Sequence, residues 1–472
     1  MSLRDTVRTW IGRTRPVDRR TSAALEERWA SLPVGVQTPE QLLGRHAIGC
    51  EGTHGVFPKC NLTCSPCYHS RDANKVRVDG SHTVTEVEKQ MAYLAERRGP
   101  RAHAQLIGGE VSLLAPDDHA EALLAMHRHG REPMSMTHGD FDYDYLKRVV
   151  LDAEGRVRLR RVSFAAHFDS LMRGRRGIPR PRSEAELDGH RAAFVDMFAR
   201  LRRETGVRSY LAHNMTVTPA NLREVGSVVA AVARMGYQMV SFQPAAFIGD
   251  DRRWDDDYDE VGIDTVWDEL ERGLNQRVSW KALQFGDRRC NRTAFGFTVN
   301  GGWHTICEAE VPAEVAARDV FLDHFGGVNF GGTPPALLAV KLARVLVRHP
   351  RDVAVIAGWT RSVVGRVGGP LVLVTAALRG DVAPMTYVVH NFMDAQDVIP
   401  AWQQLKAGVV AGDQRTRATQ ERLQACTYTM AHPETGELVP ACAQHSALDP
   451  AENEQLRRLL PLTVLGREPA TA

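Results

Sequence analysis

The sequence predicts an α/β fold with parallel strands, and two observations lead to this prediction. Between about residues 54 and 245, short apolar runs of strand-like composition alternate with longer segments of helical periodicity. Proline and glycine lie at the segment boundaries, as Pro116 and Gly130 do around one expected helix. Six strand–helix units in series place the strands parallel to one another, joined by right-handed crossovers.

The expected elements follow one another closely along this part of the chain. Strands are expected in "GVFPK" (55–59), "HAQLIGG" (103–109), "EPMSMTHG" (132–139), "RRVSFAAHF" (160–168), "RSYLAHNMTV" (208–217) and "YQMVSFQPA" (237–245). Helices are expected over 83–98, 116–130, 140–153, 183–205 and 219–236. The turns that follow the strands then all lie at the same edge of the sheet, where barrel folds have their catalytic residues.

Composition sets the class of protein. The chain has 472 residues, enough for two domains or more, and 43% hydrophobic with 25% charged residues is ordinary for a soluble protein. The net charge of +2 argues neither for nor against nucleic acid, and no nucleic-acid partner is expected. The longest apolar runs, such as residues 336–347, are too short and too basic to span a bilayer. With no export signal, the eight cysteines are expected to be reduced, in a cytoplasmic protein.

Three parts of the chain are expected. Residues 1–45 form a basic N-terminal segment, in which Leu3, Val7, Trp10 and Ile11 share one face of an amphipathic helix. Such a helix lies on an anionic membrane or packs on the body of the protein, and both readings stay open. Residues 46–250 form the core, and residues 251–472 form a C-terminal α+β domain.

A cysteine-rich loop follows the first expected strand. Cys60, Cys64 and Cys67 have the spacing C-x3-C-x2-C. Thiolates are the soft ligands that iron–sulfur clusters take, and three of them hold three irons of a cubane. A zinc site is the alternative, with His69 as a fourth ligand, although a second cysteine pair of the usual spacing is missing nearby.

The spacing of this motif, followed by Gly108-Gly109-Glu110 one βα unit later, resembles the radical SAM superfamily. The resemblance implies a partial (β/α)6 TIM-type barrel and a catalytic [4Fe–4S] cluster on the three cysteines. It implies that S-adenosylmethionine (SAM) chelates the fourth iron, and that the glycine–glutamate segment binds the SAM amino group. It also implies a small electron donor of the ferredoxin or flavodoxin type.

Four other residues are candidates for SAM or substrate contacts. Many members of the superfamily carry an aromatic residue just before the third cysteine, where this chain has Pro66. Tyr68, just after the cysteine, is expected to pack on the adenine instead. Ser163, His167 and Asp169 at the fourth strand are expected to contact ribose or substrate, or are ordinary polar residues at a strand end.

The C-terminal part carries four cysteines at the ends of two expected hairpins. Cys290 and Cys307 flank two strand-like runs around an Asn-Gly turn, and Cys426 and Cys442 flank a second turn. Each hairpin presents two thiols at its open end. The four thiols are expected to hold a second, auxiliary [4Fe–4S] cluster; zinc and four unrelated buried thiols are the alternatives.

The finer resemblance is to the tetraether-lipid synthases and their bacterial relatives. It is carried by "VSFQPAAFIGD" (240–250), "VVHNFMDAQD" (388–397), "HFDSL" (167–171) and the last hairpin. Such enzymes abstract hydrogen from unactivated carbon of lipid chains and form carbon–carbon bonds. This chain lacks the C-x2-C pairs of the rubredoxin-like site that they usually carry before the cysteine loop.

Two other functions remain open. One is a peptide-modifying radical SAM enzyme with a SPASM-like auxiliary domain; such domains usually have seven or more cysteines, against four here. The other is an iron–sulfur or zinc protein that regulates or scaffolds. A lipid substrate leads us to expect an elongated apolar cavity that runs from the Cys60–Cys67 loop to the surface, lined partly by the C-terminal part.

Overall fold

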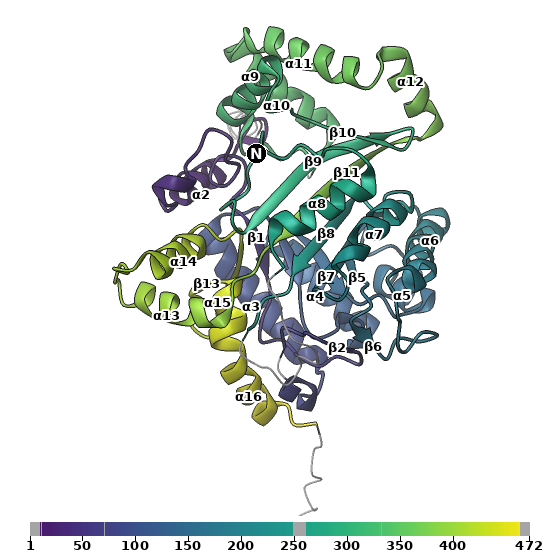
Figure 1. The fold of residues 1–472 in the computed structure, drawn as a ribbon, viewed down its shortest axis with the longest axis vertical. Helices are drawn as coiled ribbons and strands as arrows, with labels where there is room; N and C mark the ends of the chain where they lie inside the picture. The colour runs from purple at the N-terminus through teal and green to yellow at the C-terminus, as the bar shows by residue number, and fades with distance from the viewer. Residues whose placement is uncertain (1–9, 11, 70, 249–260, 332, 463–472) are drawn as a thin grey trace, which may run out of the picture.

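The computed structural model describes residues 10, 12–69, 71–248, 261–331 and 333–462 (Figure 1). Of the expected N-terminal amphipathic helix, Leu3, Val7 and Ile11 lie outside the described residues. The first helix that the figure labels is α2 (Arg19–Ala30), capped by the Asp18 side chain, which accepts from the Thr21 amide.

One eleven-stranded sheet organises the molecule, in the order β10-β9-β11-β8-β7-β5-β4-β3-β1-β12-β13. The strands from β12 through β1 to β11 run parallel, and β9, β10 and β13 are antiparallel to their neighbours. The bounds are β1 Cys50–Gly52, β3 Ala102–Leu106, β4 Arg131–Thr137, β5 Arg161–His167, β7 Arg208–Val217, β8 Met239–Pro244, β9 Asn291–Val299, β10 Gly302–Thr305, β11 Val382–His390, β12 Tyr428–Ala431 and β13 Leu438–Pro440.

Helices connect the parallel strands of the core, as expected for βα units. They are α3 (Gly80–Arg98), α4 (Pro116–Arg128), α5 (Tyr143–Val150), α6 (Asp188–Thr205) and α7 (Val225–Val232), and α8 (Ile263–Leu274) follows the last of these strands, β8. Their apolar faces and the outer face of the sheet form the largest hydrophobic cluster. The α/β fold class and five of the six expected strands are confirmed.

The first expected strand is wrong. Residues 55–59 form no strand, and β1 lies just before them, at Cys50–Gly52. Val56 and Phe57 are apolar because they are buried in the core, each 1% exposed, and not because they belong to a strand. The sequence pattern did not predict β1 because this strand is three residues long and contains a buried glutamate.

The C-terminal part adds strands to both ends of the same sheet. β11 pairs with β8, and β12 pairs with β1, so the sheet crosses the expected boundary at residue 250 twice. The remaining helices are α9 (Pro312–Val320), α10 (Pro335–Arg348), α11 (Asp352–Arg366), α12 (Pro370–Arg379), α13 (Ala395–Lys406), α14 (Gln414–Gln424), α15 (Ala441–Ala443) and α16 (Asp449–Leu459). In Figure 1, α9 to α12 form a group beyond β9 and β10. The division into parts stays a prediction.

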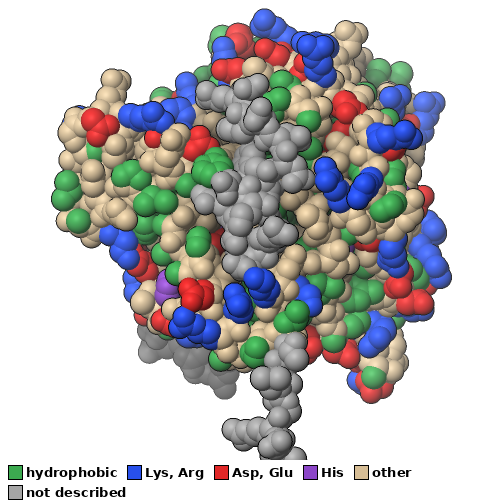
Figure 2. All heavy atoms as spheres, turned by 60° about the horizontal axis from the view of Figure 1, so that its bottom comes forward, with side chains coloured by type: hydrophobic (Ala, Val, Ile, Leu, Met, Phe, Trp, Pro, Cys, Tyr) green, Lys and Arg blue, Asp and Glu red, His purple; other side chains and the backbone are tan. Residues whose placement is uncertain are grey.

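Within the described residues, no helix alone has the length and apolar composition to cross a membrane. Among the helices that the structure describes, only α11 and α12 taken together pass that test, and a 74° bend separates them. On the face shown in Figure 2, basic and acidic side chains are interspersed.

A buried ion pair ties β1 to β4 across β3. Arg131 Nε donates to Glu51 Oε2 at 2.8 Å and its Nη2 donates to Oε1 at 3.0 Å. Both side chains are fully buried, and Arg98 lies 3.8 Å from the same carboxylate. Such a pair is costly to break because the remaining charge stays buried without its partner.

We therefore expect Arg131→Met to lower the free energy of unfolding by about 3 kcal/mol. Chemical denaturation followed by circular dichroism measures the change. The matched control is the triple variant Glu51→Met, Arg98→Met, Arg131→Met, which removes every charge of this buried group and should recover most of the loss. A single variant as stable as the wild type would contradict the proposed cost.

Candidate metal and cofactor site

A cavity of about 300 Å³ lies on the inner face of the sheet. Side chains of β3, β4, β5, β7 and β8 line it at every second position, as Met134 and Met136 do on β4 and Asn214 and Thr216 on β7. Residues beyond 284 line it as well, including Phe285, Phe392 and Met393. The sheet therefore curves around this cavity as a partial barrel, and the C-terminal part forms one side of it.

The loop with Cys60, Cys64 and Cys67 faces this cavity, and all three residues line it. A two-stranded ladder holds the loop, because β2 (Thr63–Cys64) pairs with β6 (Met172–Arg173). The amide of Leu62 donates to Cys60 Sγ at 3.3 Å. An amide hydrogen bond of this kind stabilises a thiolate and tunes a cluster bound to it.

Gly108 and Gly109 are glycines because the cysteine loop itself lies against them. A Cβ at Gly109 would lie 2.1 Å from the carbonyl oxygen of Lys59 and 2.2 Å from that of Pro58. A Cβ at Gly108 would lie 2.7 Å from the ring of Phe57. The absent side chains thus admit the backbone that leads into the cysteine loop. Both glycines also line the cavity, and their contact with SAM stays a prediction.

Glu110 is 1% exposed and joins the ends of two neighbouring strands. Its Oε1 accepts from the Thr137 hydroxyl at 2.6 Å and from the Ser112 amide at 2.9 Å. Its Oε2 accepts from the His138 amide at 2.7 Å. The carboxylate thus fixes the rim of the cavity, which it also lines.

His167 and Asp169 line the cavity, whereas Ser163, on the same strand, does not. His167 Nε2 lies 2.6 Å from Asp169 Oδ2, which also accepts from the amide of Thr216 at 3.2 Å. Asp169 is buried, so this pair forms a fixed polar end to β5.

Tyr68 lines the cavity and packs against two aromatic side chains of the C-terminal part. Its ring centroid lies 5.6 Å from that of His445 in a stacked geometry and 5.1 Å from that of Phe392. The two parts of the chain therefore meet over the cysteine loop. An adenine contact for Tyr68 stays a prediction.

Three of the four C-terminal cysteines reach the cavity: Cys290, Cys426 and Cys442. Cys307 does not, and its thiol donates instead to the carbonyl of Glu314 at 3.4 Å. The reason is that the two strands of this hairpin differ in length. β10 is only four residues long, and the amide of Ile306 already binds the carbonyl of Phe295. The segment after β10 therefore separates from β9 near Phe295. At the usual rise per residue, that point is about 16 Å along the strand from Cys290.

Burial raises the pKa values of two of these thiols. Burial raises the pKa of Cys290 to about 11, and Arg422 opposes this rise by donating from Nε to its sulfur at 3.1 Å. Burial also raises the pKa of Cys442, with Cys426 and Cys290 as neighbouring thiols. A metal bound by either thiol would therefore have to displace its proton.

Several polar groups at the cavity escaped the sequence analysis. Asn214 and Thr216 on β7 and Ser241 and Gln243 on β8 face inward. Ser241 Oγ is buried and has no hydrogen-bond partner among the described residues, so it is available to a ligand. The signal was present, because these positions alternate with apolar ones along each strand.

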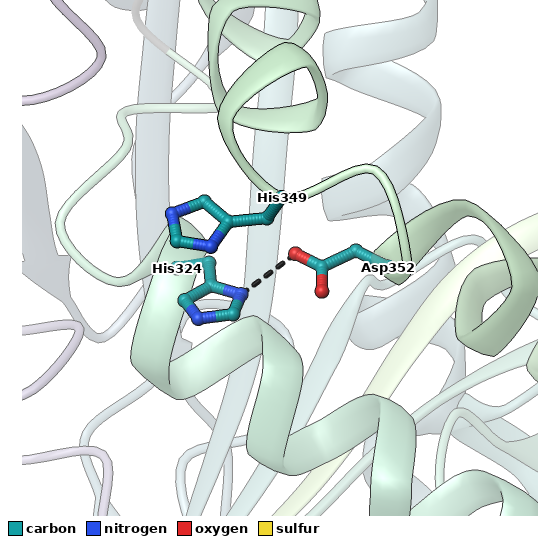
Figure 3. Close-up of side chains that lie close together, drawn as sticks. All are labelled: His324, His349 and Asp352. Carbon is teal, nitrogen blue, oxygen red and sulfur yellow. Dashed lines mark hydrogen bonds and ion pairs between the residues drawn. The ribbon is translucent and has the colours of Figure 1, made fainter.

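A second group of metal-binding side chain types lies outside the cavity (Figure 3). Ligand atoms of His324, His349 and Asp352 lie within 4.8 Å of one another. The two imidazoles, however, stack with centroids 3.7 Å apart and planes 18° apart. Because a metal lies near the plane of each imidazole ligand, one ion cannot bind both rings in this arrangement. His324 Nδ1 instead pairs with Asp352 Oδ2 at 2.6 Å, which ties the start of α11 to the segment after α9.

No protein-family model matches the chain, and no curated protein gives a significant match. Among solved structures it is similar to native anSMEcpe with bound AdoMet, at 13% identity and a TM-score of 0.32, over 48% of this chain and 59% of that one. It is also similar to Streptococcus suis SuiB bound to S-adenosylmethionine, at 12% identity and a TM-score of 0.29, over 49% of this chain and 44% of that one. The radical SAM enzyme HemN of Escherichia coli, a coproporphyrinogen III oxidase, is similar at 13% identity and a TM-score of 0.34, over 63% of this chain and 60% of that one. The chain spans less than two thirds of each of these structures. Likenesses at such low scores do not assign an activity.

The contact between Gly109 and the loop backbone leads to a prediction. Gly109→Ala should push the loop out of the cavity and raise the rate at which iodoacetamide alkylates Cys60, Cys64 and Cys67 in the metal-free protein. Peptide mass spectrometry measures the rates. Gly189→Ala is the matched control, since a Cβ there meets nothing within 4 Å. Equal rates in both variants would contradict the steric account.

Proposed function

We propose that this protein is a radical SAM enzyme. The observation that carries the proposal is a loop with three cysteines in C-x3-C-x2-C spacing. All three cysteines line one cavity at the rim of a parallel sheet. Three thiolates fit a cubane that keeps one iron open for a small chelating ligand. Polar groups that face the same space, such as Ser241 Oγ, supply hydrogen bonds to that ligand.

The cofactors of the proposal are a [4Fe–4S] cluster on Cys60, Cys64 and Cys67, SAM, and an auxiliary [4Fe–4S] cluster on C-terminal cysteines. Cys60, Cys64 and Cys67 would hold the first cluster, which would supply one-electron reductive cleavage of SAM and, through it, hydrogen abstraction from the substrate. The electron comes from a ferredoxin- or flavodoxin-type partner.

The chain itself positions these groups and excludes water. Gly108 and Gly109 let the cysteine loop lie against β3, and the Glu110 carboxylate locks that corner to β4. His167 and Asp169 present a fixed polar pair beside it. In the proposal these groups orient SAM, while the packing of Tyr68 on Phe392 closes the site from the C-terminal side.

A lipid chain is the proposed substrate. The cavity surface is mostly apolar, with methionines among its side chains: Met134, Met136, Met172, Met239 and Met393. Methionine is flexible and fits irregular apolar ligands such as hydrocarbon. A peptide that adds a strand to a sheet is less well supported, because the two edge strands β10 and β13 have only four and three residues.

Peripheral membrane contact is also part of the proposal, and it rests on α10, α11 and α12. Large apolar side chains stand exposed there, among them Leu371 at 75%, Val374 at 55% and Leu378 at 83%. Between residues 335 and 379 the only acidic residue is Asp352, which is buried. Exposed apolar and basic side chains without carboxylates suit the surface of an anionic bilayer.

The catalytic assignment predicts the behaviour of a triple variant. After anaerobic reconstitution and reduction, replacement of Cys60, Cys64 and Cys67 by alanine should abolish 5′-deoxyadenosine formation from SAM, measured by chromatography. Cys307→Ala is the control with one thiol removed outside the cavity, and it should keep the activity. Activity in the triple variant would sink the assignment.

The substrate class can be tested by isotope transfer. Perdeuterated acyl chains of a phospholipid should pass deuterium to 5′-deoxyadenosine, because the abstracted atom ends on its methyl group. Mass spectrometry detects the label. Transfer from a deuterated peptide but not from lipid would replace the lipid proposal with the peptide one.

For the membrane contact, we expect the variant Leu371→Ser, Val374→Ser, Leu378→Ser to float poorly with vesicles that contain phosphatidylglycerol. The matched control removes exposed valines elsewhere, Val34→Ser with Val410→Ser, and should float like the wild type. Equal flotation of all three proteins would argue against this surface.

A further inference from the structure

Cys50 lies beside the C-terminal cysteines, although the sequence suggested no role for it. It is the first residue of β1 and lines the same cavity as Cys426. Its amide donates to the carbonyl of Thr427 at 2.6 Å, and its register partner on β12 is Tyr428. The two cysteines thus lie at the start of adjacent parallel strands.

Thr427 also brings Cys290 into this neighbourhood. Asn291, next to Cys290, donates from Nδ2 to Thr427 Oγ1 at 2.9 Å. The last cysteine arrives through the final hairpin, in which Thr429 pairs with Pro440, two residues before Cys442. Backbone pairing and sequence adjacency therefore bring four cysteines from separate chain segments near Thr427, and all four residues line the cavity.

Arginine side chains contact three of these four cysteines. Arg422 donates to the Cys290 sulfur, Arg28 donates to the carbonyl of Cys426 at 2.8 Å, and Arg98 donates to the carbonyl of Cys50 at 3.3 Å. Acidic groups nearby have arginine partners of their own: Glu51 pairs with Arg131 and Asp287 with Arg289. A cubane with four thiolates carries net negative charge, which these guanidiniums would balance.

We infer that Cys50, Cys290, Cys426 and Cys442 together hold the auxiliary [4Fe–4S] cluster, with Cys50 as the fourth ligand in place of Cys307. The inference deepens the proposed function and rests on it only for the presence of a second cluster. Each iron then has a thiolate from the protein. No open position remains for substrate, so this cluster serves electron transfer at the cavity wall.

The test uses the full chain in which Cys60, Cys64 and Cys67 are alanine, so that only the auxiliary site remains. After reconstitution with iron and sulfide under argon, this protein should bind about four irons. Adding Cys307→Ala should leave the iron content and the EPR spectrum of the reduced protein unchanged. Adding Cys50→Ala should lower the iron content, or leave a cluster that mild oxidation converts to the three-iron form, visible by EPR.

Loss of the cluster in the Cys307→Ala protein, or an unchanged cluster in the Cys50→Ala protein, would overturn the ligand set. Zinc in place of iron in the parent protein would overturn the cluster type. Misfolding of the Cys50→Ala protein would mimic a loss of ligation, so a second measurement uses no variant at Cys50. Reconstitution should protect Cys50 from alkylation, and full alkylation of Cys50 in the loaded parent protein would also overturn the inference. SAM cleavage is absent throughout, so these outcomes are independent of the catalytic proposal.

Discussion

The whole site depends on one contact point, Thr427, where the two ends of a curved sheet meet. Its carbonyl accepts from the amide of Cys50, and its hydroxyl accepts from Asn291. Two glycines make room for it: a Cβ at Gly49 would lie 2.7 Å from the Thr427 carbonyl oxygen, and one at Gly286 would lie 2.4 Å from its methyl group. No pairing between the two ends of the sheet is present in the described part of the chain, where β9 and β13 lie far apart in the strand order.

The contacts at Thr427 close the curved sheet around one cavity, and cysteines line two sides of that cavity. Cys60, Cys64 and Cys67 belong to the loop after β1, and the other three cavity cysteines after residue 284 come from the segments that close the gap. One apolar space of about 300 Å³ touches both sets. In the proposal, a substrate held there would lie between the site of hydrogen abstraction and the auxiliary cluster.

The sequence allowed prediction of those features that local patterns determine. The strands from β3 to β8 alternate with helices at the expected places, and the Cys60–Cys67 spacing identified the loop that faces the cavity. Features set by long-range geometry escaped. The short β10 carries Cys307 away, and Cys50 reaches Cys426 only through the pairing of β1 with β12, nearly 380 residues apart. The reason for Gly109 was also tertiary, since the backbone of Lys59 occupies the space of its missing side chain.

The central claim is that two iron–sulfur clusters border one cavity. The most direct measurement is anomalous diffraction at the iron edge, from crystals of the wild-type chain reconstituted and grown without oxygen. The account predicts two separate iron peaks, one at Cys60, Cys64 and Cys67 and one among Cys50, Cys290, Cys426 and Cys442. A single peak, or a peak beside Cys307, would contradict it.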